Sequence, residues 1–289
     1  MKLRMEITST RIFRDANSSR ELEVLATGFR FLEGPAWDER LQRLVFSDIP
    51  GNGLYQWKED EGTSLVRANG FLPNGNTFDK DGNLITCEHG TSRVSMTTTD
   101  AEYIVLADSY QGVPLNSPND VVAADDGSYV FTDPPYGRYD KTGIPRMQEL
   151  PFQGVYRVRR ERKEPILLVD DFDRPNGLCF SLDGKRLFVA DTARDHIRVF
   201  DINDDGSLSK GCVWAEVVRD APGVFDGIRM SEDGLLWCTG PGGILVYDEL
   251  ARLLGRLFIP EIAANLAWGG PGGRDLFITA TTTLYRICM

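Results

Sequence analysis

Six copies of one short unit recur along the 289-residue chain, and this repeat restricts the fold more than any other feature. Each copy begins with a polar, oxygen-bearing residue, usually beside Gly or Pro, and continues as a short apolar run. A turn rich in Asp and Gly then leads to a second apolar run, which ends near an acid in most copies. The six starting residues are Glu33, Asn74, Asn119, Asn176, Asp226 and Asn265.

The register of the copies is regular. From each starting residue to the end of the second run, the chain takes 14 or 15 residues in every copy. The turns between the two runs hold Asp and Gly, which are typical of hairpins because both tolerate positive φ. A third apolar run follows in most copies and a fourth is fainter. The second runs are Leu44–Asp48, Leu84–Glu88, Tyr129–Asp133, Leu187–Asp191, Leu235–Gly240 and Leu276–Ala280.

About four strands per repeat of roughly 40 residues, without a long helical period, predict an all-β chain built from propeller blades. We therefore expect a six-bladed β-propeller that spans residues 1–289 as a single domain. The last copy runs out after three strands, so the strand Glu23–Ala26 is expected to close the ring as the outer strand of the last blade. Residues 1–20 form a polar lead-in without an assigned place, and residues 134–153 form a long insert in the third copy.

The charge balance indicates the kind of partner. Lys plus Arg number 32 and Asp plus Glu number 43, so the net charge of −11 disfavours nucleic acid and suits a cation or a neutral ligand. No run is long enough for a membrane span, and the start lacks an apolar signal core. The five cysteines form no C-x-x-C motif and indicate reduced residues in a cytoplasmic protein. The oligomeric state stays open, with a dimer as one alternative.

The starting residues are predicted to converge at one mouth of the central channel, because the first strand of each copy is taken as the inner strand. Two carboxylates, Glu33 and Asp226, with side-chain amides would form an all-oxygen set that suits one divalent ion. Ca²⁺ is preferred, with Mg²⁺, Mn²⁺ and Zn²⁺ as alternatives, although neither histidine falls on the ring. The competing interpretation is that these Asn-Gly and Asp-Gly pairs are only turn residues.

The motifs Glu33-Gly-Pro, Ser117-Pro-Asn-Asp120, Arg174-Pro-Asn-Gly177 and Phe225-Asp-Gly227 resemble the gluconolactonase/regucalcin (senescence marker protein) family. Phe131–Gly137 and Cys87–Gly90 resemble its bacterial sugar-lactonase branch. The resemblance runs from about residue 23 to 287. It implies metal ligands at Glu33, Asn176 and Asp226, with Asn119 as a further ligand or a substrate contact. Asp226 would also be the general base. Animal members carry Arg at the position of Ser117, so substrate hydroxyls must be held differently here.

The resemblance implies metal-dependent hydrolysis of a sugar lactone such as D-glucono-1,5-lactone. The ion would polarise the carbonyl, and Asp226 would activate water. His89 follows Glu88 near the mouth, and Tyr136 and Arg146 lie on the insert, so these residues are expected to contact the substrate. Two alternatives remain, a phosphotriesterase- or arylesterase-like hydrolase on the same metal site and a non-catalytic propeller scaffold.

Overall fold

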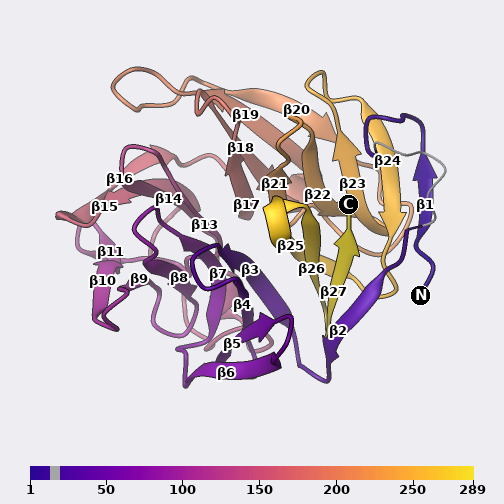
Figure 1. Cartoon of the computed structure of the whole chain (residues 1–289). Helices are drawn as coiled ribbons and strands as arrows, with labels where there is room; N and C mark the ends of the chain where they lie inside the picture. The colour runs from indigo at the N-terminus through magenta and orange to yellow at the C-terminus, as the bar shows by residue number, and fades with distance from the viewer. Residues whose placement is uncertain (14–19) are drawn as a thin grey trace.

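The computed structural model describes residues 1–13 and 20–289, and this part of the chain forms six sheets of four or five strands around a central axis (Figure 1). In each sheet, the first strand of a sequence repeat lies innermost and successive antiparallel strands follow outward. Strand order within the sheets therefore matches chain order, except where the two ends of the chain contribute. The predicted all-β, six-bladed β-propeller is confirmed.

The blades have the following strands. Blade 1 holds β3 (Leu32–Asp38), β4 (Arg43–Asp48), β5 (Gly53–Lys58) and β6 (Gly62–Ala68). Blade 2 holds β7 (Pro73–Phe78), β8 (Leu84–Glu88), β9 (Arg93–Thr97) and β10 (Tyr103–Ala107). Blade 3 holds β13 (Val121–Ala123), β14 (Ser128–Asp133), β15 (Gly154–Arg159) and β16 (Arg162–Val169).

Blade 4 holds β17 (Pro175–Phe180), β18 (Arg186–Asp191), β19 (His196–Asp201) and β20 (Cys212–Glu216). Blade 5 holds β21 (Ile228–Met230), β22 (Leu236–Gly240), β23 (Gly243–Tyr247), β24 (Leu253–Phe258) and β1 (Arg4–Ile7). Blade 6 holds β25 (Ala263–Gly269), β26 (Asp275–Ala280), β27 (Thr283–Cys288) and β2 (Glu23–Thr27).

Neighbouring blades pack face to face, so the second strands are buried on both sides. All residues of β8 and β14 are buried, for example. Aromatic side chains fill the space between blades, as where Trp37 of blade 1 stacks on Phe277 of blade 6 at 5.4 Å between ring centroids. A strand covered on both faces can be apolar at successive positions, which explains why the second runs of the repeat lack clean alternation.

The ring closes through the N-terminal strand, as predicted. β2 pairs with β27 in antiparallel register, with Glu23 opposite Arg286 and Thr27 opposite Thr283. Arg286 also binds the Glu23 carboxylate at 2.8 Å. β2 is the fourth strand of the sheet that the last repeat begins. Its pairing with β27 therefore joins the two ends of the propeller and completes blade 6.

The residues before this strand correct one expectation. We expected residues 1–20 to be a polar lead-in, but β1 pairs with β24 and adds a fifth strand to blade 5. Leu3, Ile12 and Phe13 are buried in the cluster that includes Trp237 of β22. Residues 14–19 of the predicted lead-in lie outside the described residues.

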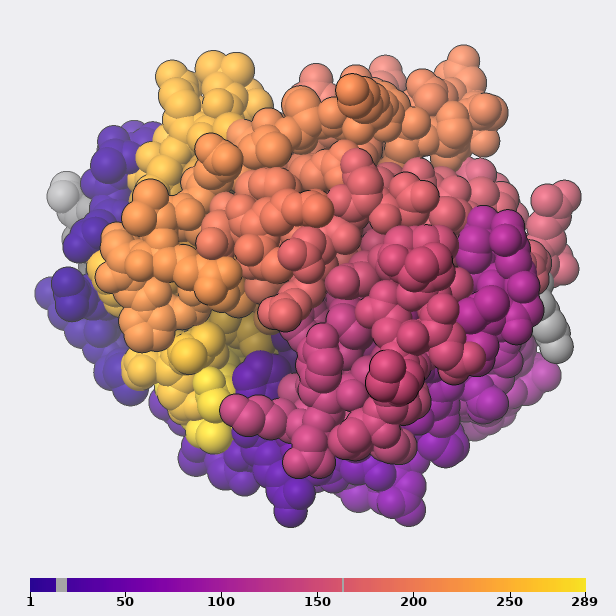
Figure 2. Space-filling model, turned by 180° about the vertical axis from the view of Figure 1, so that it is seen from behind, coloured from indigo at the N-terminus to yellow at the C-terminus, as the bar shows by residue number. Residues whose placement is uncertain are grey.

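Short elements complete the chain. They are the two-stranded β11 (Ser109–Tyr110) and β12 (Val113–Pro114), and the 3-10 turns η1 (Tyr136–Arg138), η2 (Thr192–Arg194) and η3 (Pro271–Gly273). Apart from η1, the predicted insert 134–153 has no helix or strand. Within the described residues, no helix reaches the length and apolar character of a membrane span. Figure 2 shows one face hollowed near its middle, with indigo atoms from the early chain seen at depth.

Candidate metal centre

The six starting residues of the repeats, from here on called the ring residues, lie where the inner strands begin. In several blades the strand has a β-bulge at this point. Pairing between inner and second strand shifts register between Glu33 and Ala36, between Pro73 and Asn76, and between Pro175 and Leu178. A bulge twists its strand and redirects side chains. The polar residue is thereby turned toward the channel mouth while the rest of the strand keeps its ladder.

A glycine follows the ring residue in four copies, and it serves contact between blades rather than a hairpin turn. A Cβ on Gly34 would lie 2.0 Å from the carbonyl oxygen of Asn74, the ring residue of the next blade. A Cβ on Gly177 would lie 2.1 Å from the carbonyl oxygen of Asp226. Gly75 and Gly227 are packed in the same way against Asn119 and Asn265. The absent side chain thus lets adjacent ring residues approach each other closely.

These residues line a cavity of about 260 Å³. Five of the six ring positions contribute to its wall, and two more of the predicted substrate residues do so. The predicted residues found there are Glu33, Asn74, His89, Asn119, Tyr136, Asn176 and Asp226, and further walls come from Phe31, Ile49, Thr142, Arg174, Thr192, Ala193, Arg219 and Val224. Segments separated by almost 200 residues in the chain therefore meet at one site.

The two ring carboxyl groups lie against each other. Burial is the main cause that raises the pKa of Glu33 to about 7, although the backbone N–H of Gly34 donates to its Oε2 at 2.8 Å. Burial also raises the pKa of Asp226 well above its usual range, helped by the charge of Glu33 and a hydrogen bond between the two groups. Like charges held this close favour a shared proton or a cation between them.

Asn176 leaves one buried oxygen without a partner. Its amide Nδ2 donates to Thr192 Oγ1 at 3.0 Å, and Thr192 in turn donates to the carbonyl oxygen of Phe225 at 2.6 Å. This chain of hydrogen bonds fixes which way the amide faces. Asn176 Oδ1 is buried and accepts no hydrogen bond from any described residue. Such an orphaned acceptor beside two carboxyl groups is a ready metal ligand.

The remaining ring amides differ in what they do. Asn265 Nδ2 donates to Glu33 Oε2 at 3.1 Å, so this residue orients a carboxylate from behind. Asn119 is buried, and its backbone N–H donates to Thr132 while its side chain lines the cavity. Asn74 contacts the nitrogen Nε2 of His89 through its amide Nδ2 at 2.9 Å.

His89 lines the cavity as a neutral side chain. Nδ1 lies 2.9 Å from the carbonyl oxygen of Thr142, which can only accept, so Nδ1 carries the proton and Nε2 accepts from Asn74. Burial is the main cause that lowers the pKa of His89 to about 4. An imidazole ring with both nitrogens engaged is poorly suited to shuttle protons.

The insert contributes Tyr136 but not Arg146. The Tyr136 hydroxyl is within hydrogen-bonding reach of Thr192 and Asn176, and burial raises the pKa of this phenol. Arg146, predicted to contact substrate, does not line the cavity. Its guanidinium donates to the carbonyl oxygen of His89 at 2.7 Å and to Ser92 Oγ at 2.6 Å. It points away from the cavity because these two groups of blade 2 and the carbonyl oxygens of Gly137 and Ile144 in the insert accept its hydrogen bonds.

Sequence reasoning missed several polar residues of the site. Asp120, next to Asn119, is buried and pairs with Arg229 of β21 at 3.2 Å, and its charge contributes to the raised pKa of both Glu33 and Asp226. Arg174 and Arg219 line the cavity wall. Asp120 could have been found from its place in the Ser117–Asp120 motif. Arg219 lies in a stretch outside the repeat unit and carries no sequence signal.

A metal centre on the described residues would be mixed in ligand type. No group of three or more His, Cys, Asp or Glu side chains gathers as a metal cluster in this part of the chain. Glu33, Asp226 and the orphaned oxygen of Asn176 instead supply two charged ligands and one neutral ligand. All three are oxygen donors, which fits a hard divalent ion.

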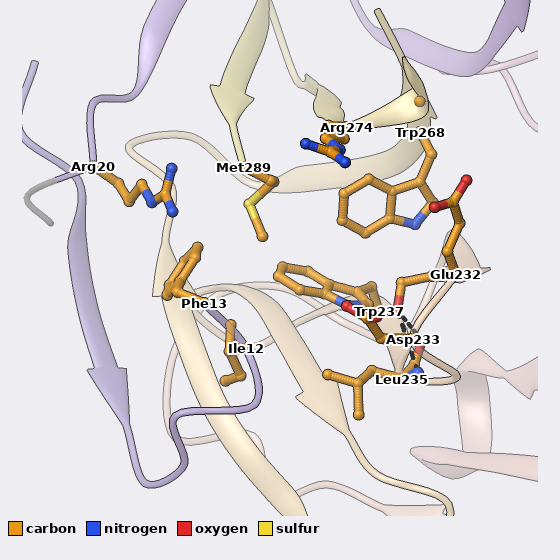
Figure 3. A pocket seen from close by; sticks show the side chains of 12 residues that line it. Ile12, Phe13, Arg20, Glu232, Asp233, Leu235, Trp237, Trp268, Arg274 and Met289 are labelled. Atoms are coloured by element: carbon orange, nitrogen blue, oxygen red, sulfur yellow. Dashed lines mark hydrogen bonds between the residues drawn. The ribbon is translucent and has the colours of Figure 1, made fainter. Parts of the chain in front are cut away.

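A second pocket, of about 190 Å³, lies between blades 5 and 6 and the N-terminal segment (Figure 3). Trp237 and Trp268 meet there edge to face, with ring centroids 5.2 Å apart. Glu232 and Asp233 belong to the hairpin turn that joins β21 to β22. None of the predicted site residues lines this pocket, so the ring cavity is the site to which the repeat points.

Comparisons with known proteins find similarity over most of the chain. Residues 31–282 match the model of the SMP-30/Gluconolactonase/LRE-like region. The chain is similar to a gluconolactonase of Zymomonas mobilis, with 28% identity over 93% of this chain and 81% of the relative. It is also similar to a pentonolactonase of Haloferax volcanii, with 26% identity over 89% and 83% of the two chains. The solved structure of a Xanthomonas campestris gluconolactonase superposes with a TM-score of 0.92, at 32% identity and with 100% and 95% of the chains covered.

Proposed function

Because the chain belongs to the SMP-30/gluconolactonase/LRE-like family, we propose that it is a metal-dependent hydrolase that opens a sugar lactone to the aldonic acid. The observation that carries this proposal is the meeting of Glu33, Asp226 and the orphaned Asn176 Oδ1 in one cavity. The names of two relatives, a gluconolactonase and a pentonolactonase, support a lactone as the substrate class and leave the sugar open.

Glu33, Asn176 and Asp226 would hold one divalent ion, with Asn119 as a fourth group at the same wall. Ca²⁺ suits this all-oxygen set best, because it accepts carboxylate and amide oxygens in flexible numbers. Bound there, the ion would supply Lewis acidity toward the lactone carbonyl. Its charge would also replace the proton that the raised pKa values of Glu33 and Asp226 retain in its absence.

Asp226 is the residue placed to move protons. As a carboxylate it takes a proton from the water whose oxygen attacks the lactone carbonyl carbon. When the ring C–O bond breaks, Asp226 returns that proton to the departing ring oxygen, which becomes a hydroxyl group. Glu33 keeps its charge in this sequence and is oriented by Asn265 and Gly34.

The other wall residues bind and position the lactone. The Tyr136 hydroxyl and the amide of Asn119 offer hydrogen bonds to sugar hydroxyls, and Phe31, Ile49 and Val224 offer apolar contact. His89 shapes the wall through its fixed contacts with Asn74 and Thr142.

The test uses the full-length protein stripped of metal. Acid release from D-glucono-1,5-lactone should be absent after chelation and should return when one of Ca²⁺, Mg²⁺, Mn²⁺ or Zn²⁺ is added back singly. An aryl ester and an organophosphate serve as comparison substrates. The proposal fails if no lactone is hydrolysed by protein that demonstrably binds an ion, or if the chelated protein keeps full activity.

A further inference from the structure

One arginine at the cavity wall has no partner for its charge. Arg174 is exposed, and its guanidinium makes no hydrogen bond or ion pair within residues 1–13 and 20–289. Its backbone lies at φ +67, in the left-handed region, immediately before Pro175. The N–H of Arg174 donates to Gln153 Oε1 at 2.8 Å, which fixes this loop to the insert.

The backbone of Arg174 is fixed beside the cavity, and the residue lines its wall. Arg174 stands two residues before the predicted ligand Asn176 and lines the same wall. Tyr136 and Asp226 line the same cavity as Arg174. A group bound between Tyr136 and the ring carboxyl groups therefore lies within the field of Arg174.

The charges of the cavity do not cancel once a divalent ion is bound. The ion balances Glu33 and Asp226, and His89 is neutral. Arg219, the other basic residue of the wall, is already neutralised, because its Nε binds Asp195 Oδ1 at 2.5 Å and its Nη2 donates to the carbonyl oxygen of Thr192 at 3.1 Å. The single positive charge of Arg174 remains.

We propose that Arg174 is a specificity-determining residue, and that the preferred substrate is a lactone carrying one carboxylate besides the ring ester. This inference rests on the proposed lactone hydrolysis and names its substrate class. A neutral sugar lactone leaves Arg174 unpaired, whereas a carboxylate on the sugar accepts a charge-assisted hydrogen bond from it. A planar guanidinium suits a planar carboxylate in particular.

The test compares two lactones that differ only at the far carbon, D-glucono-1,4-lactone and D-glucaro-1,4-lactone. We expect wild-type protein to have the higher kcat/KM for the glucarolactone. The substitution Arg174→Gln should lower that value about 10- to 100-fold, mainly through KM, and change the value for gluconolactone about threefold or less. Arg174→Lys should restore part of the preference, and Arg219→Gln should have a smaller effect because its charge is already paired.

Three outcomes would overturn the proposal. Equal losses on both lactones would mean that Arg174 only supports the loop, and an unchanged ratio would mean that it does not touch the substrate. A stronger preference for 6-phospho-D-glucono-1,5-lactone over its unphosphorylated form would assign the anion to a phosphoryl group instead.

A binding measurement separates this failure from failure of the proposed reaction. If neither lactone is hydrolysed, titration of Ca²⁺-loaded protein with D-glucarate and D-gluconate still tests the site. Arg174→Gln should then weaken glucarate binding selectively, with Arg162→Gln on the outer strand of blade 3 as the unaffected control. If both variants still bind glucarate in preference to gluconate as wild-type protein does, the proposal is wrong.

Discussion

Two sets of carboxyl groups come from the same repeat and have opposite surroundings. Asp48, Asp133 and Asp191 end the second strands. Asp48 and Asp133 each accept hydrogen bonds from two successive backbone N–H groups of the chain that enters the blade. Asp191 accepts one such bond, from Asp173, and also binds Arg194, while its Oδ1 has no partner among the described residues. Glu33 and Asp226 begin the inner strands, face the cavity and lie against each other. Both sets are near the same mouth of the channel.

The comparison indicates what separates the two sets. A carboxylate whose oxygens accept hydrogen bonds from backbone N–H groups stabilises the fold, whereas a carboxylate without such donors is left to bind a proton or an ion. Both oxygens of Asp133 are used, one by the N–H of Asn116 and one by the N–H of Ser117, each at 2.7 Å. Glu88 departs from the pattern, since Thr91, Ser95 and Tyr103 satisfy it with hydroxyl groups. Asp226 instead has a carboxyl group as its neighbour, which leaves it dependent on a proton or a cation.

The largest effect is expected from removing the chemical acid. Asp226→Asn takes away the proposed base and one charged ligand while keeping the shape of the side chain. We expect kcat for lactone hydrolysis to fall about 100- to 10,000-fold, with the circular dichroism spectrum unchanged. The unfolding midpoint of chelated protein should not fall, because a buried charge has been removed. A variant with wild-type kcat would refute the role of Asp226.

A smaller effect on the cavity-facing carboxyl groups is expected from Asn265→Ala. This substitution removes the amide that donates a hydrogen bond to Glu33 Oε2. Glu33 would lose its orientation, so the affinity for the activating ion should fall about tenfold, as measured by calorimetric titration. Asn83→Ala is the matched control, because Asn83 is a buried amide bound to Asp79 in a hairpin turn of blade 2. Equal losses in the two variants would contradict the proposed orienting role.

An Asp→Asn substitution at the end of a second strand tests the acids that bind backbone N–H groups. Asp133→Asn leaves one of the two N–H groups of Asn116 and Ser117 facing an amide NH₂. The free energy of unfolding should fall by about 1–3 kcal/mol, as measured by denaturant titration. The ion affinity of the folded variant should stay within about threefold of wild type. If Asp133→Asn lost its affinity for the ion while its free energy of unfolding stayed unchanged, Asp133 would belong with the ion-binding acids instead.

The smallest effect is expected in how the stability contributed by Asp133 depends on pH. Burial raises the pKa of Asp133 from its ordinary 3.8 to about 7, against lowering by the two N–H groups. Between these values the folded protein holds a proton that the unfolded chain has lost, so the stabilisation from Asp133 is largest at low pH and declines toward pH 7. The cost of Asp133→Asn should therefore be larger near pH 5 than near pH 8. A cost that grows with pH would contradict this sign.

The repeat made most of the architecture predictable. Six polar starts with a fixed distance to the second run led to six blades, and the missing fourth strand of the last copy led to β2 as the closing strand. β1 could not be foreseen, because Arg4–Ile7 belongs to no repeat. Its place depends on the free edge of β24, which only the assembled blade provides.

The site was predictable where the repeat carries it. Glu33, Asn119, Asn176 and Asp226 were assigned from register and resemblance, and all four line one cavity. Arg146 was misplaced because the direction of a long side chain on an insert depends on which carbonyl groups accept from it. Arg219 was missed because a connection outside the repeat gives no position relative to the channel.

The sequence by itself determined the number of blades, their closure and the ring of oxygen-bearing residues, because hydrophobic periodicity and turn residues act locally and repeat. The tertiary structure decided which of the many acids is satisfied and which is left facing the cavity. That choice depends on N–H groups of the segment that enters the blade, such as the N–H of Ser117 for Asp133, and on charges from other blades, such as the carboxylate of Glu33 for Asp226. Long-range neighbours of this kind have no expression in the local pattern of residues.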